Sequence, residues 1–333
     1  MSTLTGPVAE RAAWWARLSW VTWRQHRAAL AGVAAVLGGL SLLLLVTGLH
    51  TRAVYSGLGL AACHPVSTRS CAAQLTLFNE QYDGWATALT ALLQVVPVLL
   101  GVFTGAPLLA RELETGTFRF AWTQGAGRIR PVVVKLILLG LALSALAAAF
   151  TVLFAWWYRP FYQPGTSLLK PDVFDLSGLD FAAWTLAAFA LGAFAGAAIR
   201  RAVPAIGAAL AGYAILALAV PFYLRYRIYQ APVVAHLTGP GQHPIPGRAF
   251  VVRTWLTWPS GQPLGPSAIY ATAHQRAAAR VPAWLAQHRY GQAVAFQPAT
   301  RFWHFQLIEG GWLLMLAILL GAATIWLVRR RSG

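Results

Sequence analysis

The chain has 333 residues, of which 58% are hydrophobic and only 11% are charged, and its formal net charge is +17. A soluble domain usually carries about a quarter charged residues, so this composition excludes an ordinary soluble protein and indicates an integral membrane protein. The positive charge does not indicate nucleic-acid binding, because the arginines stand in short segments beside apolar runs, as in the cytoplasmic loops of membrane proteins.

The N-terminal segment, residues 1–27, combines four tryptophans with four arginines. As a helix it places Trp14, Leu18 and Val21 on one side and arginines on another. This pattern predicts a helix lying in the cytoplasmic membrane interface, with tryptophan at headgroup depth. An ordinary basic flank of the first span is the alternative.

Charge-free intervals locate the membrane spans, since about 20 apolar residues as helix cross a bilayer. They predict six spans: Ala28–His50, Gly84–Ala110, Leu136–Tyr158, Phe181–Ile199, Ala202–Leu224 and Gly310–Val328. Another charge-free interval, Thr254–Gln275, is rich in Pro, Gly and hydroxyl residues, and its unsatisfied backbone would be costly in lipid. We interpret this interval as a loop.

The expected fold is therefore an all-α integral membrane protein with six transmembrane helices, an N-terminal interfacial helix and a large extracytoplasmic loop between spans five and six. The regions are the interfacial helix (1–27), spans one to five (28–224) with a cytoplasmic loop at 110–135, the extracytoplasmic loop (225–302), and span six with a basic cytoplasmic tail (303–333). Prolines favour bendable second and fifth spans: Pro97, Pro107, Pro204 and Pro221.

Lysine and arginine counts orient these spans. The N-terminal segment, the loop at 110–135, the turn at 200–201 and the C-terminal tail hold fourteen of these residues, whereas the first and third loops hold four. Because positive residues are enriched on the cytoplasmic side, we expect a multi-pass plasma-membrane protein with both termini in the cytoplasm. The eight arginines of the long loop do not change this, since long loops cross largely regardless of charge.

Two cysteines, Cys63 and Cys71, lie in the first outer loop in this orientation. A disulfide between them is reasonable on an oxidising side of the membrane. Two unpaired small residues are the alternative.

Several kinds of chemistry are absent from the sequence. It contains no Walker A, H-E-x-x-H, C-x-x-C or G-x-S-x-G motif. We therefore expect no catalytic residue, no ATP hydrolysis by this chain, no cofactor and no metal. None of the nine acidic residues stands in the middle of a predicted span, and Glu309 is interpreted as an interfacial cap at the outer start of the last span.

The most polar segment between two spans is "ARELETGTFRFAWTQGAGRIRPVVVKL", Ala110–Leu136. It resembles the cytoplasmic loop of ABC-2-type transporter permeases, in particular their actinobacterial branch. There an E-x-G-T core follows the second span, and an aromatic-Thr-Gln segment, a basic residue and a lysine lead into the third. The matching residues here are Glu114, Gly116, Thr117, Trp122, Thr123, Gln124, Arg128 and Lys135. The segments "WVTWRQHR" and "QPATRFWHFQLIEGGWLLMLAILLGAATIWLVRRR" are similar to the same branch, and the family also has six spans.

The resemblance implies a permease subunit of an ATP-binding-cassette exporter, driven by a separate ATP-binding subunit. The loop would be its coupling helix, and the residues expected to contact the ATPase subunit are Glu112, Glu114, Gly116, Thr117, Arg119, Thr123, Gln124 and Arg128. A positively charged loop that only fixes topology is the alternative. The importer signature E-A-A-x-x-x-G is absent, which favours export. The apolar, uncharged spans fit a hydrophobic or amphipathic substrate. Two permeases, identical or similar, are expected to pair in the membrane lipid, without nucleic acid.

Two other functions stay open on the sequence. A membrane-embedded lipid-modifying enzyme would need clustered polar residues at one bilayer face, for which the outer loop is the candidate place. A non-transporting membrane sensor or anchor is the other alternative. An adjacent gene for an ATP-binding-cassette subunit would favour the transporter.

Overall fold

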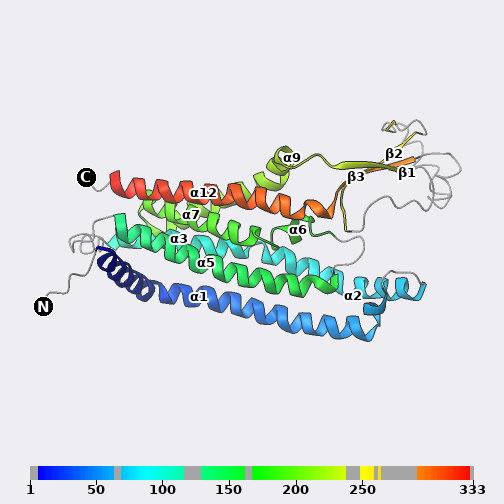
Figure 1. Ribbon diagram of the computed structural model, residues 1–333, viewed down its shortest axis with the longest axis horizontal. Coiled ribbons are helices and arrows are strands. Elements are labelled where there is room, and N and C mark those ends of the chain that lie inside the picture. The colour runs from blue at the N-terminus through cyan, green and yellow to red at the C-terminus, as the bar shows by residue number, and fades with distance from the viewer. Residues whose placement is uncertain are drawn as a thin grey trace.

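The computed structural model describes residues 7–63, 69–115, 129–161, 167–237, 248–258, 262–263 and 291–330. Long helices run side by side in one bundle, and a small sheet extends from one of its ends (Figure 1). We call this end the sheet end. The opposite end, where α1 begins and α12 finishes, is called the terminal end.

The long helices are α1 (Pro7–Gly57), α2 (Arg69–Leu93), α3 (Val96–Thr115), α5 (Ile129–Tyr158), α7 (Asp180–Ile199), α8 (Ala202–Ala219) and α12 (Phe302–Arg330). Six stretches of the described residues are long and apolar enough to cross a membrane: Leu30–Gly57, Ala73–Glu114, Ile129–Phe161, Asp180–Ile199, Ala202–Leu224 and Ala299–Arg330. The predicted six-span helical membrane fold is thereby confirmed.

Helix α1 differs from the prediction of a separate interfacial helix. It runs without a break from Pro7 to Gly57, so residue 27 is not a helix end. The sequence around that position contains Ala and Leu and no Pro or Gly, and nothing there stops a helix. Trp20 and Trp23 are exposed, which fits an interfacial position. The side chains of Trp14, Leu18 and Val21 lie outside those described, so the interfacial face stays a prediction.

The second span is divided into two helices. Helix α2 ends at Leu93 and α3 begins at Val96. Pro97 explains the break, because its ring has no N–H for the carbonyl of Leu93 and clashes with it. The amide of Gln94, in the break, donates to the backbone oxygen of Asp172 at 2.6 Å. The break therefore fastens this span to the short helix α6 (Pro171–Phe174).

Helix α7 forms the centre of the bundle, where it packs against α3, α5, α8 and α12. Its closest contact, with α3, is lined by glycines from both helices: Gly101 and Gly105 on α3, and Gly192 and Gly196 on α7. A Cβ atom at Gly105 would collide with the backbone oxygen of Phe189, and one at Gly192 would lie 2.7 Å from the backbone nitrogen of Ala106. Small residues spaced by four let two membrane helices approach backbone to backbone.

An aromatic cluster joins α1, α2 and α5 near the sheet end. Trp157, Phe78 and Phe154 are fully buried there. The indole N–H of Trp157 donates to Thr47 Oγ1 at 3.0 Å, which satisfies the polar atom of this buried ring. This cluster holds α1 against the rest of the bundle.

The segment between the fifth and sixth spans contains strands, which the sequence analysis did not predict. Strands β1 (Val233–Leu237), β2 (Phe250–Thr257) and β3 (Gly291–Gln297) form an antiparallel sheet in the order β1-β3-β2. The pairing shifts register between Val251 and Arg253. The interpretation of Thr254–Gln275 as a loop is wrong for its first four residues, which belong to β2, whereas 264–275 lie outside the described residues.

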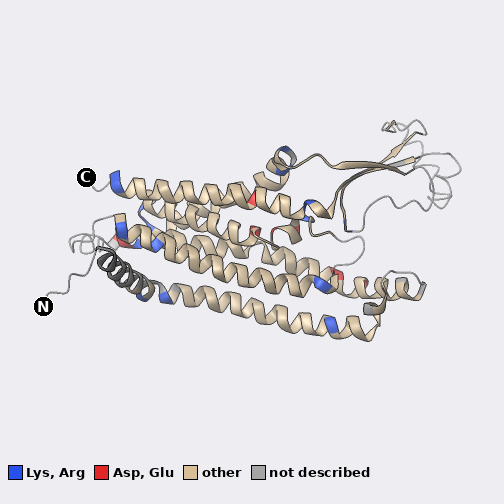
Figure 2. Cartoon of the chain, viewed as in Figure 1, with Lys and Arg blue, Asp and Glu red and all other residues tan. Residues whose placement is uncertain are grey.

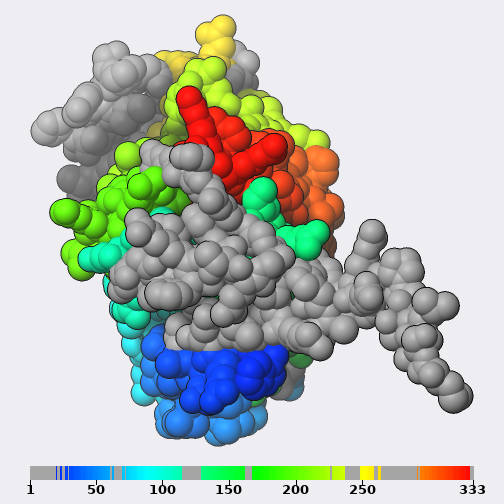
Figure 3. Space-filling model, turned by 90° about the vertical axis from the view of Figure 1, so that its left-hand side faces the viewer, coloured from blue at the N-terminus to red at the C-terminus, as the bar shows by residue number. Residues whose placement is uncertain are grey.

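Charged residues gather toward the ends of the bundle, and the long middle parts of the helices hold few of them (Figure 2). Lys and Arg are prominent at the terminal end, where α12 finishes with Arg329 and Arg330. Viewed from this end, α1 and α12 lie on opposite sides of the molecule (Figure 3). A chain with basic groups at the end of an apolar bundle suits the charge pattern of a membrane protein.

Candidate functional site

The predicted coupling loop lies at the terminal end, between α3 and α5. Residues 116–128 lie outside the described part of the chain, and with them the predicted contact residues Gly116, Thr117, Arg119, Thr123, Gln124 and Arg128, together with Trp122. The structure describes both flanks, which are the last turn of α3 with Glu112 and Glu114 and the first turns of α5 with Lys135.

Both glutamates of the flank have partners within the chain. Glu112 Oε1 forms an ion pair with Nζ of Lys135, whose side chain is almost fully buried. Glu114 Oε2 accepts a hydrogen bond from the backbone N–H of Ala202, the first residue of α8, at 3.2 Å. The first N–H groups of a helix lack partners in the helix itself, and a carboxylate there is favourable. The two glutamates therefore tie α3 to α5 and to α8, a role that the sequence analysis did not predict.

At the other end of the molecule, the Sγ atoms of Cys63 and Cys71 form a disulfide. Cys63 directly follows the short helical turn Leu60–Ala62, and Cys71 lies in the first turn of α2. The bond links the segment after α1 to the start of the second span.

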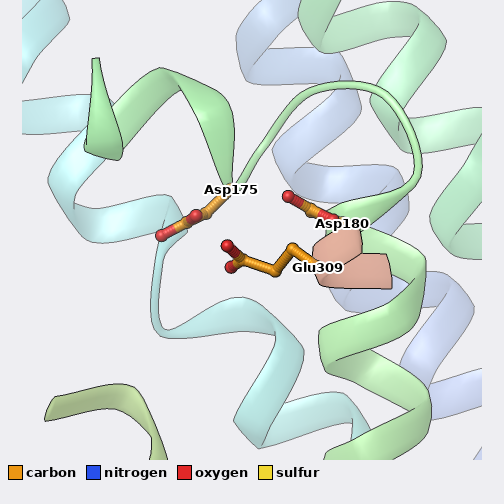
Figure 4. A group of neighbouring side chains, drawn as sticks. All are labelled: Asp175, Asp180 and Glu309. Carbon is orange, nitrogen blue, oxygen red and sulfur yellow. The ribbon is translucent and has the colours of Figure 1, made fainter. Parts of the chain in front are cut away.

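Near the sheet end, three carboxylates from separate parts of the chain lie together: Asp175, Asp180 and Glu309 (Figure 4). We call them the acidic cluster. Asp175 follows α6, Asp180 is the first residue of α7, and Glu309 is in α12. Each offers one oxygen, and these oxygens lie within 4.8 Å of one another.

Arg225 supplies a positive charge to this cluster. It begins the short helix α9 (Arg225–Ile228), directly after a π-helical turn at Val220–Leu224 that contains Pro221. Its Nε and Nη2 donate to the two oxygens of Glu309 at 3.0 and 2.8 Å, and Nη2 also forms an ion pair with Asp175. Such a two-bond fork is the strongest common arginine–carboxylate geometry.

Aromatic rings enclose the ion pairs. The hydroxyl of Tyr229 donates to Glu309 Oε2 at 2.5 Å, and its ring stacks on Phe305 with centroids 4.0 Å apart. The Arg225 guanidinium lies over the ring of Phe174 at 5.1 Å. A cavity of about 280 Å³ borders Arg225, Tyr229 and Phe305. The aromatic surroundings limit the access of water to the charges and so strengthen the pairing.

Asp180 differs from the other two carboxylates. Its side chain is 0% exposed, and neither of its oxygens has a hydrogen-bond partner among the described residues. The backbone N–H groups at this start of α7 are satisfied instead by Gln306, whose Oε1 accepts from Leu179 at 2.7 Å and from Asp180 at 3.1 Å. A buried carboxylate without a donor is unfavourable when ionised, so this oxygen pair suits a proton or a cation.

The charge of the cluster is unbalanced, because three carboxylates share one guanidinium. Burial raises the pKa of Asp175 to about 6, an effect that Arg225 opposes and Glu309 adds to. Burial also raises the pKa of the Tyr229 phenol, and the Glu309 carboxylate raises it further. Burial by itself would lower the pKa of Arg225, but Asp175 and Glu309 hold it above its usual range. The arrangement therefore keeps Arg225 charged and leaves the carboxylates competing for it.

The interpretation of Glu309 as an interfacial cap at the start of the last span is wrong. Helix α12 begins at Phe302, so Glu309 lies two turns inside it, and it is only 1% exposed. The sequence signal that could have found the cluster is the presence of ionisable residues at the borders of spans, which normally pair or line a functional path. The pairing itself could not be read, since Arg225 and Glu309 are 84 residues apart in the chain.

Comparison with known proteins places these features in a family. No curated protein and no solved structure matches the chain. Residues 32–225 match the family described as ABC-2 membrane transporter related, and this range is more than half of the 333 residues. The match contains the flanks of the predicted coupling loop and Asp175, Asp180 and Arg225, but not Glu309. With six membrane-spanning helices and this match, the chain belongs to the ABC-2 membrane transporter related family and is a permease-type, multi-pass membrane protein.

Proposed function

We propose that this protein is the membrane-spanning subunit of an ATP-driven exporter and that a separate ATP-binding subunit docks on the loop between α3 and α5. The observation that carries the proposal is the anchoring of that loop. Glu112 and Glu114 fasten its first flank to α5 and α8, so a force applied to the loop reaches three helices at once. Membership of the ABC-2 family supplies the expectation of a partner that hydrolyses ATP.

The glycine contact between α3 and α7 extends this path into the bundle. Backbones packed without intervening side chains move together, because there are no side-chain rotamers to absorb a displacement. Motion of the loop would therefore carry α7 with α3. Helix α7 begins at Asp180 in the acidic cluster, next to Glu309 on α12, so the same displacement would reach the sheet end.

The proposed orientation puts the terminal end in the cytoplasm, on the basis of the fourteen-to-four distribution of lysine and arginine. Export, and not import, is favoured by the absence of the E-A-A-x-x-x-G signature from the sequence. Two copies, or this chain with a similar one, would enclose the substrate path. The apolar spans favour a hydrophobic or amphipathic substrate.

The decisive experiment is purification of the tagged chain from its native membrane, followed by identification of co-purifying subunits and measurement of ATP hydrolysis. A stoichiometric ATP-binding-cassette subunit is expected. Gly116→Pro should lower the amount of this subunit that co-purifies, or the substrate-stimulated ATPase activity of the complex. Gly116 directly follows α3, at the start of the loop on which the subunit is proposed to dock. Gly241→Pro, in the segment between spans five and six, is the matched control and should change neither.

Two outcomes would contradict the proposal. Purification of the intact chain without any ATP-binding subunit would favour a membrane-embedded enzyme or a sensor. Equal recovery and coupling in Gly116→Pro and the unmodified chain would reduce the loop to a topology signal.

A further inference from the structure

A large cavity lies at the sheet end, separate from the smaller cavity that borders the acidic cluster. Its volume is about 1190 Å³, and it is bordered by α1, α5, the turn before α7 and the first turn of α12. Pockets for drug-sized ligands usually have volumes of about 300–1,000 Å³, so this cavity has room for a longer molecule. None of the three clustered carboxylates is among its described lining residues.

Three arginines border the cavity: Arg52 near the end of α1, Arg159 directly after α5, and Arg248 before β2. Its described lining contains no aspartate and no glutamate. Within the described part of the chain, neither Arg52 nor Arg159 forms an ion pair with a carboxylate. Two arginines facing one cavity without a carboxylate repel each other, and an anion between them would remove this repulsion.

Arg52 is held in place with one donor unused. Its Nη2 donates to the backbone oxygen of Trp156 at 2.5 Å, and its guanidinium lies over the Trp156 ring at 4.5 Å. Its Nε is buried and has no acceptor among the described residues. The buried Nε itself is not accessible to a ligand, but a planar guanidinium fixed beside a cavity suits the oxygens of a phosphate or carboxylate through its remaining N–H groups.

Away from the arginines, the wall of the cavity is apolar. Along α5, toward the middle of the bundle, it is lined by Ala155, Val152 and Ala148, with Thr151 among them. Phe302 and Trp303, in the first turn of α12, line the cavity at the level of the sheet end. Ala148 and Arg159 are eleven positions apart, which corresponds to about 16 Å of helix. The cavity is therefore basic toward the sheet end and apolar toward the middle of the bundle, parallel to the helices.

We propose that this cavity binds an anionic amphiphile, such as a phospholipid with a net negative headgroup. The headgroup oxygens lie between Arg52 and Arg159, and an acyl chain lies against the apolar wall of α5. The charge gradient of the cavity matches that of the ligand along the same axis. This assignment does not rest on ATP-driven export, since it needs only the chain itself and a lipid.

The test uses the purified full chain in an uncharged detergent and native mass spectrometry with phosphatidylglycerol and phosphatidylcholine of identical acyl chains. Preferential retention of phosphatidylglycerol is expected. Arg159→Gln, an exposed position that does not endanger folding, and Arg52→Gln should each weaken this retention about tenfold, the loss expected for one charged hydrogen-bonded contact. Arg227→Gln, another exposed arginine at the same end that does not line the cavity, should leave it unchanged.

A second arm separates a lipid from a free anion. Val152 is 71% exposed and lines the apolar part, so Val152→Trp fills the cavity without disturbing the core. Phosphatidylglycerol retention should fall, whereas inorganic phosphate should neither bind comparably nor displace the lipid.

Three results would overturn the assignment: equal retention of the two lipids, equal losses in Arg159→Gln and Arg227→Gln, or displacement by inorganic phosphate with Val152→Trp unaffected. The last result would identify a simple anion site. The assay contains no ATP and no second subunit, so these results are independent of whether the exporter proposal holds.

Discussion

The two ends of the bundle both join helices through charged side chains, but they do so in opposite ways. At the terminal end the two described carboxylates each have their own partner, since Glu112 pairs with Lys135 and Glu114 caps α8. At the sheet end three carboxylates share Arg225, and Asp180 has no donor among the described residues. Charge-balanced contacts hold neighbouring helices together. The stability of an unbalanced buried cluster, by contrast, changes when a proton or a cation is added to it.

The largest expected effect is removal of Arg225, because it leaves the acidic cluster without its positive charge. Breaking a buried pair by removing one partner costs about 3–5 kcal/mol, so Arg225→Gln should lower the thermal stability of the detergent-solubilised protein strongly. Arg227→Gln, the exposed neighbour in the same short helix, is the control and should change stability by about 0.5 kcal/mol or less.

Restoring the charge balance should recover part of the loss. Adding Glu309→Gln to Arg225→Gln removes one of the unpaired carboxylates, and the double variant should be more stable than Arg225→Gln alone. A double variant whose losses simply add would show that the two residues are not coupled.

The glycine contact between α3 and α7, which lies between the two ends, gives the next largest effect on stability. Gly105→Ala places a Cβ against the backbone oxygen of Phe189, and such overpacking costs typically about 1–3 kcal/mol. Gly207→Ala in α8 is the matched control, because its added Cβ meets nothing within 4 Å. Thermal unfolding of both variants should show destabilisation in the first and no loss in the second. Equal behaviour would mean that α3 and α7 are not closely packed.

The unbalanced end should also respond to pH. The pKa of Asp175 is raised from 3.8 to about 6 in the folded protein, so the folded state binds this proton more readily than the unfolded chain. Lowering the pH from 7 to 5 should therefore stabilise the fold through this group by about 1 kcal/mol, and the gain should be lost as the pH rises through 6.

Asp175→Asn isolates that contribution, because it removes this carboxyl alone and leaves the charged groups that face it, Arg225, Glu309, Asp172 and Asp180, in place. The comparison is the difference between the pH profiles of melting temperature for the two proteins. Identical profiles would place the pH response elsewhere.

The limits of the spans were predicted most accurately where charged residues directly flank the apolar run. Arg200, Arg201 and Arg225 delimit the fourth and fifth spans, and the predicted Ala202–Leu224 matches the structure. Helices α1 and α12 extend past their apolar runs, because arginine, glutamate and glutamine are good helix formers in water as well. The glycine pairs of α3 and α7 were visible as "GVFTG" and "GAFAG", but nothing in the sequence says that they face each other.

The features that were missed depend on contacts between distant segments. Strand β1 pairs with β3 across the segment that separates Leu237 from Gly291, much of it polar and rich in Pro and Gly. The acidic cluster joins Asp175 and Arg225, 50 residues apart, and Arg225 and Glu309, 84 residues apart. Hydropathy and local spacing report the span borders at which these residues lie, but they do not report which borders meet.

The smallest stability effect is expected at Glu114, and it separates two roles of one carboxylate. Glu114 is exposed, and a carboxylate at an exposed helix N-terminus contributes about 0.3–1 kcal/mol, so Glu114→Gln should lower thermal stability only slightly through the lost charge at α8. If the same carboxylate also meets a cationic group of an ATP-binding subunit, Glu114→Lys should reduce co-purification of that subunit far more than Glu114→Gln does. Glu112→Gln is the matched comparison, because Glu112 is turned to Lys135 and should affect stability more than assembly. Equal recovery of the subunit with Glu114→Gln and Glu114→Lys, at unchanged insertion into the membrane, would leave Glu114 as a helix cap within the chain and would move the docking contact into residues 116–128.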